Sequence, residues 1–124
     1  MATTSVLPLG TASAPSTDPI ARGGLALTVR VGASVTIGEE MRLVAQGRTG
    51  SVSVFVLQGA VEPPVVLEGQ PLLQRDGADW LMLLRPQERI AIAPHMGITA
   101  MSPRSGRALR VVINAPRDVP ITRA

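Results

Sequence analysis

Short segments of alternating apolar and polar residues, separated by Gly and Pro, restrict this chain to a fold built from small β-sheets. In residues 109–114 every second side chain is a large aliphatic one, which is the period of a strand with one buried face. Residues 114–116, Asn-Ala-Pro, end the run, because proline has no N–H for a ladder and restricts the residue before it. Alternation resumes over 119–121 and stops at Arg123. Residues 106–123 therefore predict a strand, a turn and a second strand with a cation at its tip.

The rest of the chain repeats this pattern, and its composition favours the same fold class. Further strands are predicted over residues 25–31, 35–37, 41–47, 52–56, 65–67, 80–85, 90–92 and 96–100. Apolar residues make up 45% of the chain, but there is one Phe, one Trp and no Tyr, so Val, Ile, Leu and Ala must build the core. Because β-branched residues favour sheets, we predict an all-β protein.

Two segments fall outside this pattern. Residues 1–23 are mainly Thr, Ser, Ala, Pro and Gly, and they are predicted to form a disordered N-terminal tail because they bury too little apolar surface to offset the entropy of ordering. Residues 69–79 are predicted to be a linker in which Leu72 and Leu73 pack as one helical turn. No apolar run approaches the ~20 residues of a membrane span, and the N-terminus lacks the basic region of a signal peptide. We expect a soluble, cytoplasmic protein with no membrane partner.

Charge is divided unevenly along the chain. Residues 1–84 contain five Arg and seven acidic residues, whereas residues 85–124 contain seven Arg and two acidic residues; there is no Lys. Arginine presents a planar fork that suits phosphate groups and base edges, although a GC-rich genome would also favour Arg codons. A polyanion such as nucleic acid would meet the second half of the chain.

The two halves of the chain are similar to each other at a constant spacing of 55 residues. At this spacing the matching pairs are Val35 and Ile90, Ile37 and Ile92, Met41 and Met96, Leu43 and Ile98, Ala45 and Ala100, Val54 and Leu109, Val56 and Val111, Ala60 and Ala115, and Val66 and Ile121. Segments of period two can match by chance, but one register from the second to the fifth strand favours an internal duplication. Each copy is too small for a core of its own, so residues 24–68 and 80–124 are expected to share one.

Two segments resemble the carbon storage regulator family (CsrA/RsmA) of small bacterial RNA-binding translational regulators. Residues 27–40, LTVRVGASVTIGEE, are similar to the family's opening L-T-R-R-V-G-x-x-x-x-I-G. Residues 112–123, VINAPRDVPITR, are similar to its ending I-N-A-P-x-x-V-x-V-x-R. The likeness spans residues 25–123 if each copy is one repeat, and it is weak between these segments. Because a family member is one repeat acting as a homodimer, the resemblance implies two intertwined repeats that form one pseudo-twofold small β-barrel or sandwich, a monomeric pseudo-dimer.

The resemblance also implies an RNA site. In the family the first strand of one subunit lies beside the last strand of the other, and the pair reads a GGA-type element, usually in a hairpin loop. The corresponding residues here are Leu27, Thr28, Val29, Arg30, Arg117, Val119, Ile121, Thr122 and Arg123. Arg123 stands at the position of the principal RNA-binding arginine; from its position alone it would be a solvated side chain. Val29 replaces the first Arg of the family's Arg-Arg pair, and Thr122 replaces a frequent His, so one phosphate contact would be missing.

The second site implied by the resemblance would lack its arginine. It would offer Leu83, Leu84 and Arg85, but Glu68 matches Arg123 at the 55-residue spacing. A carboxylate there would repel phosphate and could not donate a hydrogen bond to guanine. We therefore expect only the first site to bind RNA.

The expected function is a non-catalytic regulator that binds an mRNA leader or a small RNA at one site and blocks ribosome access, with a protein antagonist as a further partner. The alternative is a protein-interaction module on the same pseudo-dimer after loss of RNA binding. Nothing supports an enzyme, a cofactor or a metal site: His95 is the only His and is expected to be exposed, and Glu39-Glu40 fits a solvated turn. Phe55 and Trp80 are expected to pack in the core or at an edge rather than stack on bases.

Overall fold

The computed structural model describes residues 24–102 and 107–123, and the regular secondary structure in this part of the chain is all β-strand. Its strands are β1 (Leu25–Arg30), β2 (Ser34–Ile37), β3 (Met41–Thr49), β4 (Val52–Gln58), β5 (Val65–Glu68), β6 (Leu72–Asp76), β7 (Asp79–Leu84), β8 (Arg89–Ala93), β9 (Met96–Met101), β10 (Ala108–Asn114) and β11 (Ile121–Arg123). The all-β prediction is therefore confirmed. The predicted tail, residues 1–23, lies outside the described residues.

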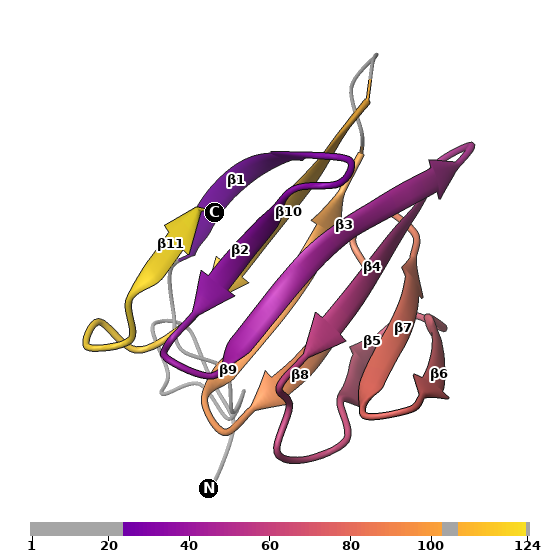
Figure 1. Cartoon of the computed structure of the whole chain (residues 1–124). Coiled ribbons are helices and arrows are strands. Elements are labelled where there is room, and N and C mark those ends of the chain that lie inside the picture. Colours follow the sequence, from indigo (N-terminus) through magenta and orange to yellow (C-terminus); the bar gives the residue numbers. More distant parts are fainter. Residues whose placement is uncertain (1–23, 103–106, 124) are drawn as a thin grey trace, which may run out of the picture.

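The strands form two antiparallel sheets packed face to face (Figure 1). Sheet A has the order β1-β10-β9-β8-β5, and sheet B has the order β11-β2-β3-β4-β7-β6. Both sheets combine strands from the two halves of the chain. The sheets are not closed into a barrel, so of the two expected architectures the protein has the sandwich.

The core lies between the sheets and is built by alternation along each strand. In β10, Leu109, Val111 and Ile113 are buried as predicted, while the residues between them are half-buried on the outer face. Each inward residue meets aliphatic side chains of the opposite sheet, and burial of such surface supplies roughly 25 cal/mol per Å². Phe55 in β4 is fully buried, as expected for a core residue, and half-buried Trp80 packs at the margin of the core.

The inward face of β4 differs from the prediction. Val54 and Val56 match the core residues Leu109 and Val111 at the 55-residue spacing, but Ser53, Phe55 and Leu57 are the buried residues of this strand. Both faces of β4 carry apolar side chains, so the period of two alone does not tell which face turns inward.

Strand pairing explains this difference. Arg42 of β3 pairs with Gln58, whereas Gly97, which matches Arg42 at the 55-residue spacing, pairs with Asn114. The two halves therefore match at a spacing of 55 residues between β3 and β9, and at a spacing of 56 residues between β4 and β10. The similarity of the halves does not run in one uninterrupted register.

The segment predicted as a linker with a helical turn instead contains strand β6. It pairs with β7 through a two-residue turn at Gly77 and Ala78, where Gly77 takes the left-handed conformation with a φ of 64°. Arg75 lies 5.5 Å from the centre of the Trp80 ring and so adds a cation–π contact across the hairpin. In the part of the chain that the structure describes, no helix is long and apolar enough to cross a membrane.

Candidate nucleic-acid interface

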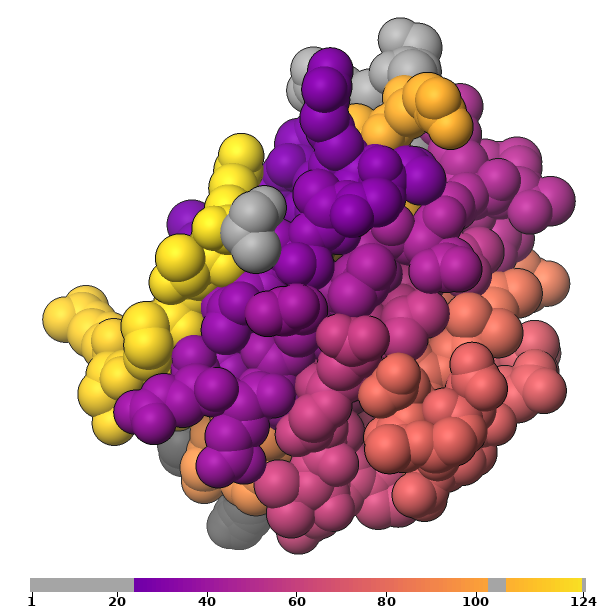
Figure 2. Space-filling view, viewed as in Figure 1, coloured from indigo at the N-terminus to yellow at the C-terminus, as the bar shows by residue number. Residues whose placement is uncertain are grey.

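Strands β1 and β11 border the same side of the sandwich, as the predicted site requires, but they belong to different sheets. β1 ends the order of sheet A and pairs with β10; β11 ends the order of sheet B and pairs with β2. Because a short turn joins β1 to β2, the two edges come to the same margin of the molecule, where Figures 1 and 2 show them together. Each strand leaves one side of its backbone without a strand partner among the described residues.

The side chains of β1 divide between the core and solvent. Leu27 is 8% exposed and Val29 is 5% exposed, so both are core residues. Thr28 and Arg30 are exposed on the outer face. Of the predicted site residues on this strand, two can therefore present a side chain to RNA, and Leu27 and Val29 can contribute only backbone N–H and C=O groups.

Strand β11 is shorter than predicted and places Arg123 at its exposed end. Ile121 and Arg123 pair with Ile37 and Val35, which lie on the inward face of sheet B, so Arg123 lies on the face turned toward sheet A. Thr122 is exposed on the opposite face. Val119 precedes the strand: its N–H donates to the carbonyl of Pro116 at 3.0 Å, and its side chain packs against the core.

Two arginines adjoin this margin. Arg110 of β10 pairs with Thr28 on the outer face of sheet A, and Arg30 ends β1. Arg117, in contrast, is exposed in the turn that leads into β11, at the far end of that strand from Arg123. The structure thus brings Arg30, Arg110 and Arg123 to one margin of the sandwich and leaves Arg117 at its end.

The counterpart of this margin on the other side of the molecule is covered. At the 55-residue spacing β7 matches β1, and it pairs with β4 on one side just as β1 pairs with β10. On its other side, however, β7 pairs with β6, so its edge is not open. Leu84 is buried, and Arg85 is exposed just beyond the strand.

Glu68 also lies near this covered margin, but strand pairing shows that it is not the structural counterpart of Arg123. Val35 pairs with Arg123, and Ile90, which matches Val35 at the 55-residue spacing, pairs with Val66. Val66 rather than Glu68 therefore stands in the position of Arg123. The Glu68 carboxylate accepts a hydrogen bond from Arg89 at 2.8 Å. Neither the Val66 side chain nor the Glu68 carboxylate could donate a hydrogen bond to a base.

A buried carboxylate that the sequence does not predict fixes the chain beside β7. Glu88 is 8% exposed, and its two carboxylate oxygens accept from the backbone N–H groups of Gln70 and Arg85 at 2.6 and 2.7 Å. Gln70 lies at the start of the connection to β6. Glu88 therefore ties this connection to the turn that follows β7.

The covering strand β6 could have been found in the sequence. Gly77-Ala78 between two strand-like segments is a hairpin signal, because Gly at the first position of a two-residue turn supplies the positive φ that such turns need. No comparable signal marks Glu88, because Gln70 is distant from it in sequence.

The described residues contain no group of three or more His, Asp and Glu side chains placed to hold a metal ion. Comparison of the chain with protein-family models, with curated proteins and with solved structures finds no match.

Proposed function

We propose that this protein is a non-catalytic RNA-binding regulator with one binding site along β1 and β11. The observation that carries the proposal is the open margin that these two edge strands border, with Thr28, Arg30 and Arg123 exposed along it. Guanidinium groups can contact phosphate or guanine edges, and unpaired strand backbone can read the edges of unstacked bases.

The strand order supports a fused pseudo-dimer. Sheet A takes its outer strands, β1 and β5, from the first half of the chain and its three middle strands from the second. Sheet B has the opposite arrangement: β11 and β7 come from the second half of the chain and flank β2, β3 and β4 from the first. Strand β6 extends this sheet beyond β7. This exchange of outer strands is what two intertwined repeats would produce.

Coverage of the opposite margin supports a single site. RNA that binds along the edge of β1 would need the edge of β7 to bind a second time, and β6 occupies that edge. With Val66 where the first site has Arg123, the second margin also has no donor at that position. We infer a stoichiometry of one RNA per chain, and a regulator that acts by covering its target in an mRNA leader.

A mobility-shift titration with a GGA-containing RNA hairpin tests the proposal. We expect Arg123→Ala to weaken binding by roughly 5- to 150-fold, the value of a bidentate contact of about 1–3 kcal/mol. Arg85→Ala is the matched control, since Arg85 is exposed beside the covered margin, and it should change the affinity little. Affinity should also fall as salt rises. No affinity for any GGA hairpin would refute the RNA-binding proposal, and two RNAs per chain would refute the single site.

A second candidate, a protein-interaction module, is favoured by the outer face of sheet B. Val44, Val56 and Leu81 form one apolar row there, and Val54, Leu83 and Leu72 form the next. Such a face is typical of an interaction surface. Replacing Leu81 and Leu83 by Gln should leave RNA affinity unchanged, because this face lies away from β1.

A further inference from the structure

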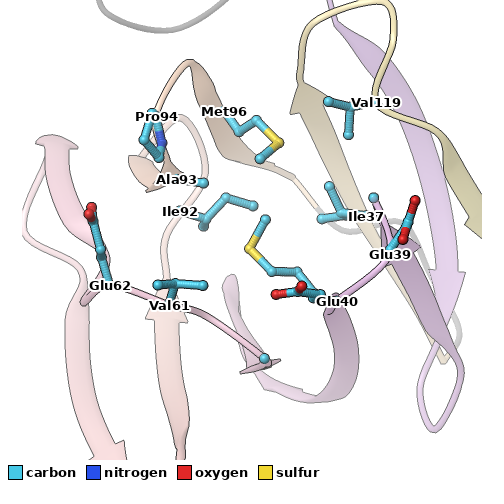
Figure 3. Close-up of a pocket in the computed structure, with 13 residues that line it drawn as sticks. Ile37, Glu39, Glu40, Val61, Glu62, Ile92, Ala93, Pro94, Met96 and Val119 are labelled. Carbon is cyan, nitrogen blue, oxygen red and sulfur yellow. The ribbon is translucent and has the colours of Figure 1, made fainter.

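A cavity of about 470 Å³ opens at one end of the sandwich (Figure 3). It lies between the β2–β3 turn, the β8–β9 turn and the connection from β4 to β5. Its volume falls within the ~300–1,000 Å³ that small-molecule sites usually have. Val119, one of the residues of the expected RNA site, also lines this cavity, but the proposed RNA contacts of Thr28, Arg30 and Arg123 lie outside its lining.

The floor of the cavity is apolar and adaptable. Ile37 and Met41 from the first half of the chain line the cavity together with Ile92 and Met96, their matches in the second half. Val61 from the β4–β5 connection adds to the same surface. Because methionine has three rotatable bonds and a polarisable sulfur, such a floor can adjust to ligands of different shape.

The rim of the cavity is acidic. Glu39 and Glu40 come from the β2–β3 turn and Glu62 from the β4–β5 connection; Figure 3 shows Glu40 between the other two. Arg and His are absent from the described residues that line the cavity, and none of the three carboxylates has a salt bridge within the described part of the chain. In a chain of net charge +3 this opening is thus a local concentration of negative charge.

We propose that this cavity binds a small organic cation with an apolar body, of the class of an alkylamine. The apolar part would contact Val61 and the methionine side chains, since Ile37 and Ile92 are almost fully buried beneath them, and the ammonium group would remain at the wet rim beside the carboxylates. A ligand of the same shape with a negative charge would be repelled, and an uncharged one would gain only the apolar contact. The cavity therefore selects by charge as well as by size.

Methionine methyl groups give a direct test. In the full chain labelled with ¹³C at the methionine methyls, hexylammonium should shift the Met41 and Met96 signals saturably. Met82, which is fully buried in the core and does not line the cavity, is the internal reference. Hexanoate should bind at least tenfold more weakly than hexylammonium, and 1-hexanol should fall between them. Equal binding of hexanoate and hexylammonium, or no saturable shift with hexylammonium, would overturn the proposal.

Variants assign the selectivity to the rim. Glu40→Gln with Glu62→Gln should weaken hexylammonium about tenfold, as expected for two solvent-exposed ion pairs, and should leave 1-hexanol unchanged. Asp118→Asn, an exposed carboxylate outside the cavity lining, is the matched control and should have no effect. An unchanged affinity for hexylammonium in the double variant would refute the role of the rim.

Two outcomes would reassign the cavity. Tighter binding of acetyl-Leu-Arg-Leu-amide than of hexylammonium would overturn the small-molecule proposal in favour of a basic side chain of a partner protein. Shifts of Met41 and Met96 that grow with protein concentration in the absence of any probe would overturn it in favour of a contact between copies of the chain.

Discussion

Replacement of Glu88 by Gln tests how the chain is fixed beside the covered margin. In the native protein two carboxylate oxygens accept from the N–H groups of Gln70 and Arg85 at 2.6 and 2.7 Å. Glutamine has nearly the same shape but only one accepting oxygen, so its amide NH₂ must face one of the two N–H donors. The substitution removes the negative charge and one hydrogen bond, and it sets two donors against each other.

The expected loss is roughly 2 kcal/mol in the free energy of unfolding. Hydrogen bonds to charged groups contribute about 1.5–3 kcal/mol each, and a buried donor left without a partner costs about 1–3 kcal/mol. The estimate lies in the lower part of this range because both hydrogen bonds are only part-buried, so water can reach the freed N–H group. For a domain of this size the midpoint of thermal unfolding should fall by roughly 8–16 °C.

Urea unfolding followed by the fluorescence of Trp80, the only Trp, provides the measurement. Glu62→Gln is the matched control: it is the same substitution at an exposed rim residue, and it should change stability by less than about 0.5 kcal/mol. Amide hydrogen exchange at Gln70 and Arg85 should also accelerate in the Glu88 variant. If Glu88→Gln were as stable as Glu62→Gln, the carboxylate would not hold this connection in place.

Two further substitutions follow from local geometry. Gly59 has a φ of 77°, and a Cβ there would collide with the carbonyl oxygen of Glu40; Gly59→Ala should therefore cost more than about 3 kcal/mol in urea unfolding, whereas Gly77→Ala, with a φ of 64° and open space around it, should cost about 1 kcal/mol. Equal losses would contradict the predicted collision. The Ser53 hydroxyl is buried without a hydrogen-bond partner among the described residues, so Ser53→Ala should be neutral or stabilise by up to about 1 kcal/mol, and a loss above 1 kcal/mol would reveal a partner for that hydroxyl.

Alternation was sufficient to predict where most strands lie, because one apolar residue in two is a local property. It predicted the buried face of β10, where the outer residues include Arg110 and Asn114, and it failed for β4, where both faces are apolar. The strand β6 was missed although the Gly77-Ala78 turn signals it. The inward face of β4 and the presence of β6 are properties of single hairpins, β3–β4 and β6–β7, and do not depend on distant strands.

The candidate site depended on relations that no local pattern contains. Pairing of β1 with β10 joins distant segments, and the likeness to a known family, rather than periodicity, suggested that the first and last strands meet. That expectation did not separate Leu27 and Val29, which are buried, from Thr28 and Arg30, which are exposed. The acidic cavity was missed for the same reason, because its rim joins two segments far apart in sequence.

The exchange of outer strands between the halves also determines how the chain can fold. β1 is made early, but its partner β10 follows nearly all the other strands, so the first strand must wait for most of the chain before it can pair. Topologies dominated by such long-range contacts fold slowly, typically in milliseconds to seconds. Neither half contains a complete sheet, so we expect the two halves to unfold together in one cooperative transition, and either half made alone to remain unfolded as a monomer.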